Sequence, residues 1–296
     1  MKDAFSSYHP IVSFAYFALV ISCAMVFMHP GCLAISLTLA IAYSIYLNGR
    51  RAVKFHLYYM MPLLVVTALL NPAFNHEGAT ILVYLSSGNP LTLESITYGI
   101  AAATMFISVI CWFSCYNAVM TSDKFIYLFG RLIPSFSLVL SMVLRLVPRF
   151  KAQLALVSSA QRCIGKDVSN GSLLARARNG IRILSILMTW MLENAVETAA
   201  SMKSRGYGLK GRTAFTLFRF DRRDRKALAA IVAIGGYTLI GAYADAVYFR
   251  YFPTMRSVEL SVYSVSVFAA YALLCAIPLF INVREDIRWK HLQSKV

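Results

Sequence analysis

The sequence predicts an all-α membrane protein with about six transmembrane helices and a cytoplasmic module of long amphipathic helices. Three observations support this fold class. Hydrophobic residues make up 58% of the 296 residues and charged residues only 14%, whereas a soluble domain averages about a quarter charged residues. Apolar runs approaching the roughly 20 residues that cross a bilayer lie on both sides of one basic segment. That segment, residues 121–226, holds 19 of the 29 Lys and Arg but only 6 of the 13 Asp and Glu.

This distribution predicts three parts. Residues 1–120 contain four spans, residues 121–226 form a module at the cytoplasmic membrane surface, and residues 227–296 contain two further spans and a charged tail. No Lys or Arg occurs from Phe55 to Asp123. Because Lys and Arg concentrate in cytoplasmic loops, the pattern predicts a multi-pass protein of the plasma membrane with both termini in the cytoplasm.

The six predicted spans are apolar runs with recognisable boundaries. Pro30-Gly31 marks a tight turn after the first span. Residues 48–54 form a short basic loop after the second, and Asn71-Pro72 ends the third. Thr92 can cap the fourth helix, with Glu94 favoured in its first turn by the helix dipole. The predicted bounds are Ile11–Met28, Cys32–Leu47, Phe55–Leu70, Thr92–Met120, Ala227–Tyr248 and Val258–Ile281, with a charged tail at Arg284–Val296.

Two long helices are predicted inside the module. The first, about Ile133–Ile164, contains Pro148, where a kink or break is expected. The second, about Ser172–Arg205, ends at Gly206. The apolar runs within these helices are shorter than the roughly 20 residues of a span, so both helices are expected at the membrane surface. Polar residues recur along the second helix every three or four positions, which predicts a polar stripe: Arg178, Arg182, Ser185, Thr189, Glu193, Glu197 and Ser201.

The common signatures of catalytic and ligand sites are absent from the sequence. There is no G-x-x-x-x-G-K-[ST] and no H-E-x-x-H motif. Residues 206–211 match G-x-G-x-x-G, but they close a helix, whereas a dinucleotide fingerprint opens one. Glu193 and Glu197 lie one helical turn apart with no neighbouring His, so they predict no metal site. The six cysteines predict no disulfide framework, and no cofactor is expected.

Two other functions stay open at this point. A membrane enzyme acting on lipid-linked phosphate substrates would depend on Asp221 and Asp224, the one obvious acidic pair at the surface. A channel or secondary carrier would be expected to show polar or broken helices at the bilayer midplane. Anionic lipid is an expected partner of the basic surface. Nucleic acid is not, because the module helices are too apolar.

Three short segments of the module carry a family resemblance. They are similar to the Leu-Arg-Phe-x-Pro segment and to the Ala-Gln-x-x-Arg-Gly and Ala-Met-x-x-Arg-Gly motifs of the transmembrane T component of energy-coupling factor transporters, a class of ABC importers of micronutrients. The matching segments are Leu144-Arg145-Leu146-Val147-Pro148, Ala160-Gln161-Arg162-Cys163-Ile164-Gly165 and Ser201-Met202-Lys203-Ser204-Arg205-Gly206.

The resemblance implies a transmembrane scaffold with no catalysis of its own. It would couple two ABC ATPase subunits, or one fused ATPase, to a substrate-binding S component that imports a vitamin or a metal ion. The implied ATPase-docking residues are Met202, Ser204, Arg205 and Gly206 at one helix end and Gln161, Arg162 and Gly165 at the other. The implied supporting residues of the coupling helices are Arg145, Pro148, Glu193 and Glu197.

The two docking motifs differ at one position. Ile164 stands where the arginine of the first motif is expected. Arg162 lies two residues earlier, which is about 200° around a helix. Arg205 is therefore expected to be the main docking residue, and the two helix ends are expected to be unequal.

Overall fold

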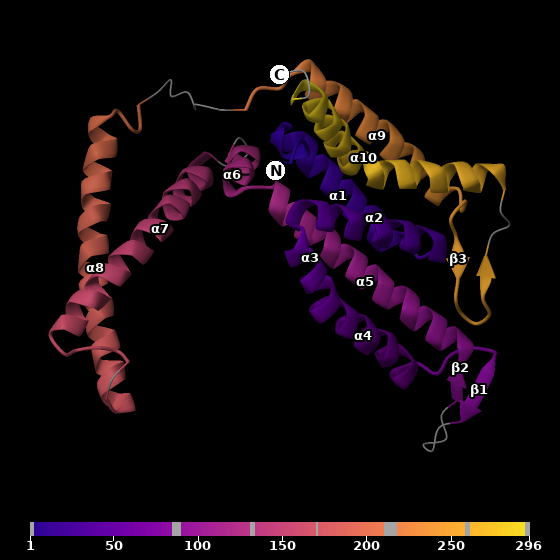
Figure 1. The fold of residues 1–296 in the computed structure, drawn as a ribbon, viewed down its shortest axis with the longest axis horizontal. Helices are drawn as coiled ribbons and strands as arrows, with labels where there is room; N and C mark the ends of the chain where they lie inside the picture. The colour runs from indigo at the N-terminus through magenta and orange to yellow at the C-terminus, as the bar shows by residue number, and fades with distance from the viewer. Residues whose placement is uncertain are drawn as a thin grey trace. The chain divides into compact units, whose positions relative to one another are not determined.

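The structure, a computed structural model, describes residues 3–84, 90–130, 134–169, 171–209, 218–257 and 261–293. The chain divides into two compact units. Met1–Lys124 together with Phe218–Val296 form the first, called here the membrane unit, and Phe125–Leu217 form the second, called the inserted unit. Most of the described elements are helices (Figure 1).

The membrane unit combines elements from both ends of the chain. A single-turn helix, Phe5–Ser7, precedes α1, and a π-helical segment, His56–Met60, joins α3 to α4. The helices are α1 Pro10–Val26, α2 Pro30–Asn48, α3 Arg50–Phe55, α4 Met61–Phe74, α5 Leu93–Val119, α9 Arg222–Tyr243 and α10 Val262–Gln293. Two short antiparallel hairpins pair β1 Ile81–Tyr84 with β2 Pro90–Thr92, and β3 Phe249–Arg250 with β4 Arg256–Ser257.

The inserted unit is built from two long helices. The short helix α6, Ser122–Gly130, leads into it and crosses the boundary between the units. The long helices are α7, Pro134–Cys163, and α8, Leu173–Ser204.

Five helical segments of the described chain are long and apolar enough to cross a membrane: Pro30–Asn48, Arg50–Phe74, Leu93–Val119, Arg222–Tyr243 and Val262–Gln293. The apolar helix α1 has 17 residues and is shorter than these. The predicted all-α membrane fold class is confirmed. The count of six spans stays a prediction, in which α1 is the remaining span.

The core of the membrane unit is aromatic and polar at once. Trp112 of α5 is fully buried and packs edge-on against Tyr16 of α1, with ring centroids 6.2 Å apart. Its indole Nε1 donates to Ser36 Oγ of α2 at 3.0 Å, and Ser36 pairs with Ser108 of α5 at 2.6 Å. Lipid tails are as apolar as leucine, so close packing and hydrogen bonds between helices hold such a bundle together.

Two predicted boundaries near α2 are wrong. Pro30 does not form a turn but begins α2, with the His29 ring accepting from the Gly31 amide at 3.1 Å. Proline suits this first position because its missing N–H has no partner there in any helix. The predicted loop at residues 48–54 is mostly the helix α3, which follows Gly49 at φ +56°.

The predicted end of the third span is also wrong, because α4 continues through Pro72 to Phe74. Pro72 cannot donate to the carbonyl of Ala68, four residues before it. Gly99 of the neighbouring helix α5 lies against this carbonyl. A Cβ added at Gly99 would lie only 2.6 Å from the carbonyl oxygen. The glycine therefore lets α5 approach α4 closely where the proline interrupts its hydrogen bonding.

The long helices differ from the predictions in three further places. α9 begins at Arg222 and ends at Tyr243, five residues earlier than predicted at each end. α10 continues to Gln293, so the predicted tail is helical as far as that residue, and the predicted start at 258–260 lies outside the described residues. α7 passes through Pro148 without a break. Pro148 is exposed, so solvent can satisfy the carbonyl that loses its helical donor.

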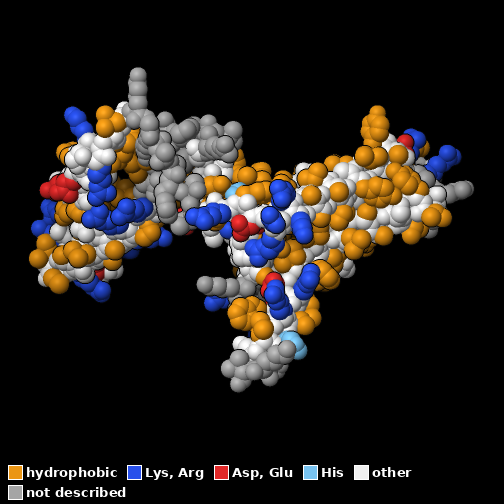
Figure 2. All heavy atoms as spheres, turned by 90° about the horizontal axis from the view of Figure 1, so that it is seen from above, with side chains coloured by type: hydrophobic (Ala, Val, Ile, Leu, Met, Phe, Trp, Pro, Cys, Tyr) orange, Lys and Arg blue, Asp and Glu red, His pale blue; other side chains and the backbone are white. Residues whose placement is uncertain are grey.

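Side chains of different kinds occupy different parts of the surface. On the face drawn in Figure 2, hydrophobic side chains cover long stretches of helix, and Lys and Arg side chains gather in a few clusters. Such continuous apolar surface is expected of a protein whose helices contact lipid or other membrane proteins.

Candidate functional site

The candidate site is the pair of helix ends of the inserted unit, called here the first tip (Ala160–Lys166) and the second tip (Ser201–Leu209). α7 and α8 carry them and pack together through a small apolar cluster. Ile183 and Leu187 of α8 are buried there against Val157 of α7, and Phe150 packs beside them. The guanidinium of Arg149 also lies 5.8 Å from the centroid of the Trp190 ring.

The second tip ends α8 with a Schellman turn. The Tyr207 amide donates to the Met202 carbonyl at 3.0 Å, and the Gly206 amide donates to the Lys203 carbonyl at 3.1 Å. Gly206 has φ +79°, a left-handed conformation that glycine adopts without a Cβ clash. Arg205 is the cap residue just before it. Its side chain is exposed and makes no hydrogen bond or ion pair with any described residue.

The first tip ends α7 in the same way. The Lys166 amide donates to the Gln161 carbonyl at 2.9 Å, and the Gly165 amide donates to the Arg162 carbonyl at 3.0 Å. Gly165 has φ +73°. Ile164 is the residue just before it, and its side chain is 60% exposed. The two tips therefore share one backbone design.

Superposing the two turns residue by residue gives the correspondence between the motifs. Ile164 takes the place of Arg205, and Arg162 takes the place of Lys203. Arg162 is therefore not in the position of the missing arginine. At the place where the second tip presents a guanidinium, the first presents an aliphatic side chain.

The flanking tip residues have mainly local roles in the described chain. The carbonyls of Gln161 and Met202 each accept the hydrogen bond from the amide five residues later that closes the turn, and both residues are half-buried. The Gln161 Oε1 atom is buried and finds no partner among the described residues. The Ser204 hydroxyl donates to the Ser201 carbonyl at 2.9 Å, which occupies its one proton within the helix.

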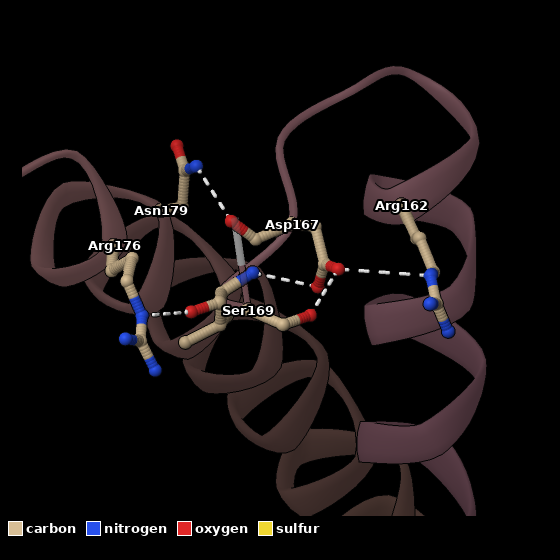
Figure 3. Close-up of polar contacts among 6 residues, drawn as sticks. Arg162, Asp167, Ser169, Arg176 and Asn179 are labelled. Carbon is tan, nitrogen blue, oxygen red and sulfur yellow. Dashed lines mark hydrogen bonds and ion pairs between the residues drawn. The ribbon is translucent and has the colours of Figure 1, made fainter. Parts of the chain in front are cut away.

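Arg162 is engaged by the loop that follows it (Figure 3). Its Nε atom lies 3.6 Å from Asp167 Oδ2, although the arginine side chain is 74% exposed. The loop is fixed to the start of α8 by two further contacts. Asn179 Nδ2 donates to the Asp167 carbonyl at 2.9 Å, and Arg176 Nε donates to the Val168 carbonyl at 2.7 Å.

Asp167 is the centre of this loop. Its carboxylate accepts from the Ser169 hydroxyl and from the Val168 amide at 2.7 Å. The hydrogen bond from the Ser169 hydroxyl holds the pKa of the Asp167 carboxyl below its usual value. The backbone amides and the charge of Arg162 lower it further. The sequence indicates a turn here, since an Asp followed two residues later by Ser favours one. It does not indicate that Arg162 joins the turn.

The remaining predicted site residues lie apart from these turns. Arg145 and Pro148 are exposed on α7, and Glu193 and Glu197 are exposed on α8. All seven members of the predicted polar stripe are exposed. Among the described residues, no group of three or more His, Cys, Asp or Glu is placed to hold a metal ion.

Comparisons with known proteins identify the family of the chain. The family model of the cobalt transport protein CbiQ matches residues 7–215. The energy-coupling factor transporter transmembrane protein EcfT of Lactobacillus helveticus strain DPC 4571 is 35% identical over 105 residues, which cover 35% of this chain and 38% of that protein. The protein of the same name from Listeria innocua serovar 6a is 26% identical over 230 residues, covering 72% of this chain and 85% of that protein.

A third relative, EcfT of Streptococcus thermophilus strain ATCC BAA-250, is 33% identical over 99 residues, covering 33% of this chain and 38% of that protein. The chain thus spans about two fifths of the length of the relatives that it matches at above 30% identity. The family model, in contrast, extends over most of the chain and includes both tips. The chain therefore belongs to the CbiQ family, and its predicted resemblance to the T components of energy-coupling factor transporters is confirmed.

Proposed function

We propose that this chain is the transmembrane scaffold of an energy-coupling factor importer of a micronutrient, a vitamin or a metal ion. It couples ATP binding and hydrolysis by partner ABC ATPases, two subunits or one fused protein, to a substrate-binding S component. It has no catalytic activity of its own. The proposal places it in the plasma membrane with both termini in the cytoplasm.

The repeated helix end is the observation that carries this proposal. Two helices of one unit finish in the same turn, each with a left-handed glycine at the apex. A glycine at such a point lets a partner backbone come close. Two like tips suit a partner with two like grooves, as a dimer of ATPase domains has. Arg205 supplies a planar, forked donor for carboxylates and carbonyls.

The exposed apolar surface of α8 supports the second contact of the proposal. Five large apolar side chains of this helix are each 55–70% exposed: Ile181, Leu184, Met188, Leu192 and Val196. A helix that shows so much apolar surface is expected to be covered by lipid or another membrane protein. We assign part of this surface to the S component.

The decisive experiment is co-purification of the ATPase subunits with variants of the chain. Arg205→Glu is expected to weaken the complex by at least about tenfold, because hydrogen bonds to charged groups contribute about 1.5–3 kcal/mol and the reversed charge also repels. Arg178→Glu is the matched control, since Arg178 is an exposed arginine near the other end of the same helix. Arg162→Glu is expected to weaken the complex less than Arg205→Glu does.

The outcomes separate the two parts of the proposal. An undiminished complex and undiminished uptake with Arg205→Glu would remove the basis for the assignment. Equal losses for the Arg205 and Arg162 variants would contradict the inequality of the tips while leaving the assignment in place.

We also propose an anionic lipid as a partner of the basic surface. A groove of about 330 Å³ in the membrane unit has Arg223 and Lys226 among its lining residues, and Tyr8, two alanines of α9 and isoleucines of α9 and α10 line the rest. The two cations suit a phosphate headgroup and the isoleucines suit an acyl chain. Native mass spectrometry of Lys226→Ala is expected to show less retained anionic lipid than Arg225→Ala. Equal retention would contradict the site.

The two aspartates on which the enzyme alternative depends are engaged in hydrogen bonds at the start of α9. Asp221 and Asp224 form the capping box of α9, in which the Asp221 amide donates to Asp224 Oδ2 at 3.1 Å. Asp224 is buried and also accepts from the His9 amide at 3.2 Å. A buried carboxylate occupied by two amides is poorly placed to act on a lipid-linked substrate.

A further inference from the structure

The N-terminal segment Asp3–His9 is bonded at both places where the chain leaves and re-enters the membrane unit. The chain leaves this unit after Lys124 and returns to it at Phe218. These two residues are far apart in the sequence, but both border the same segment of seven residues. All of the contacts described below lie inside the membrane unit.

At the exit, Lys124 binds the segment directly. Its side chain is buried, and its Nζ atom donates to the Ser6 carbonyl at 2.6 Å and to the Val119 carbonyl at 3.0 Å. Val119 is the last residue of α5. One ammonium group therefore joins the N-terminal segment, the end of α5 and the start of α6. Burial lowers the pKa of Lys124, and the nearby Asp3 opposes this effect.

At the return, the first turn of α9 binds the same segment. The Arg223 Nη2 atom donates to the Ser7 hydroxyl at 3.1 Å, and the guanidinium carbon lies 4.1 Å from the centroid of the Tyr8 ring. The His9 amide donates to Asp224 Oδ1 at 3.2 Å. The His9 ring also packs edge-on against Phe220, with centroids 5.1 Å apart.

The segment itself is fixed to the bundle. Phe5 is fully buried and packs against Tyr16 of α1, with ring centroids 5.3 Å apart. The Phe5 amide donates to Asn282 Oδ1 of α10 at 3.0 Å. Tyr43 of α2 donates to Asp3 Oδ2 at 3.3 Å. The segment thus connects the two junctions to α1, α2 and α10.

We propose that Asp3–His9 is a clasp that fixes the separation of the two junctions, with Lys124 and Arg223 as its positioning residues. The proposal rests on the proposed coupling function. A force delivered to the tips reaches the spans through the two junctions. If the junctions could separate, part of the motion would be lost in their displacement. With the clasp closed, the motion is passed to α5 and α9 together.

The geometry can be tested on the full-length chain alone in lipid nanodiscs. Spin labels at Ser122 and Arg222, both exposed and next to the junctions, report the junction distance by double electron–electron resonance. A Cys163→Ser background removes the cysteine that is exposed. Lys124→Met keeps an unbranched side chain of nearly the same length without the ammonium group and is expected to broaden the distance distribution. Arg223→Gln removes the guanidinium group at the return junction and is also expected to broaden the distance distribution.

Arg225→Gln is the matched control, because Arg225 is exposed on the same turn of α9. Unchanged distributions in both test variants would overturn the clasp. Misfolding of one variant leaves the other to decide, since the two act on different junctions.

The second measurement is substrate import per ATP hydrolysed by the assembled, reconstituted complex. Lys124→Met is expected to lower this ratio several-fold while ATP hydrolysis continues. A normal ratio together with a broadened distance distribution would overturn the role in coupling. Failure of the chain to bind any ATPase would instead contradict the proposed function, and the distance measurement would still judge the clasp.

Discussion

Ile164 and Arg205 occupy the same position, the residue just before the left-handed glycine, in two helices that end in the same turn. Only the side chain differs at that point. The two tips therefore form a natural comparison, in which the backbone is held constant and the chemistry of one residue changes.

Restoring an arginine to the first tip is expected to strengthen association with the ATPase. Ile164→Arg places a forked donor where Arg205 has one, and a charged hydrogen bond contributes about 1.5–3 kcal/mol before side-chain ordering is subtracted. We expect a gain of up to about tenfold in affinity, measured by surface plasmon resonance on the solubilised chain. Ile164→Gln is the control, because glutamine is polar but lacks the forked guanidinium group. An equal gain with Gln would assign the effect to loss of the exposed isoleucine.

The left-handed glycine of the second tip is expected to be intolerant of a Cβ. Gly206→Ala forces φ +79° on an L-residue, at a cost of about 1–2 kcal/mol. The turn should open more often, so the Tyr207 amide, bonded to the Met202 carbonyl, should exchange its hydrogen faster. Gly180→Ala, in the third turn of α8, is the control and is expected to stabilise the helix by about 0.5–1 kcal/mol. Unchanged exchange at Tyr207 would refute the strain.

The loop after the first tip is expected to loosen in Asp167→Asn. The carboxylate accepts from Val168 with one oxygen and from Ser169 with the other, whereas an amide side chain has a single acceptor oxygen and no charge, so exchange of the Val168 amide should accelerate. Arg162→Gln should have a smaller effect, because the Arg162 side chain is 74% exposed and an ion pair with so exposed a partner contributes little. If Arg162→Gln loosens the loop as much as Asp167→Asn, the ion pair and not the turn controls it.

The same carboxylate sets the pH dependence of the loop. The folded pKa of Asp167 is depressed, so its stabilisation is complete above the usual carboxyl pKa of about 4 and is lost as the pH falls through the folded value. Protection of the Val168 amide, after correction for intrinsic exchange, should be constant from neutral pH down to that range. A transition near neutral pH would contradict the assignment to Asp167.

The contact between α7 and α8 is expected to depend on one leucine. Leu187 is fully buried between them, and truncation of a buried leucine costs about 2–5 kcal/mol. Leu187→Ala should therefore lower the thermal unfolding midpoint of the purified chain. Leu184→Ala is the control, because Leu184 is 55% exposed. Equal effects of the two substitutions would argue against the packing described.

The long helices of the inserted unit were predictable because local signals define their ends. The sequence predicts the second over Ser172–Arg205, and it runs from Leu173 to Ser204 between those two cap residues. The spacing of its polar residues alone predicts the polar stripe. Helix propensity, capping and periodicity act over a few residues, so a single sequence carries them in full.

Other features depend on neighbouring segments and could not be predicted from the sequence. Asn71-Pro72 reads as a helix end, yet α4 continues because Gly99 brings α5 against the interrupted carbonyl. The ion pair between Arg162 and Asp167 needs the exact path of a loop, which residue types do not give. The contacts of Lys124 and Arg223 with residues 6–8 join positions more than 100 apart in sequence and leave no local pattern.

The shared turn separates the shape of a tip from its specificity. Any change at Gly165 or Gly206 adds a Cβ at a left-handed position and alters the backbone, whereas a change at Ile164 or Arg205 alters only an exposed side chain. Substitutions at the cap position can therefore change which partner a tip binds without changing the backbone turn. Because the chain has two tips with this turn, one tip can keep binding an existing partner while the cap residue of the other changes.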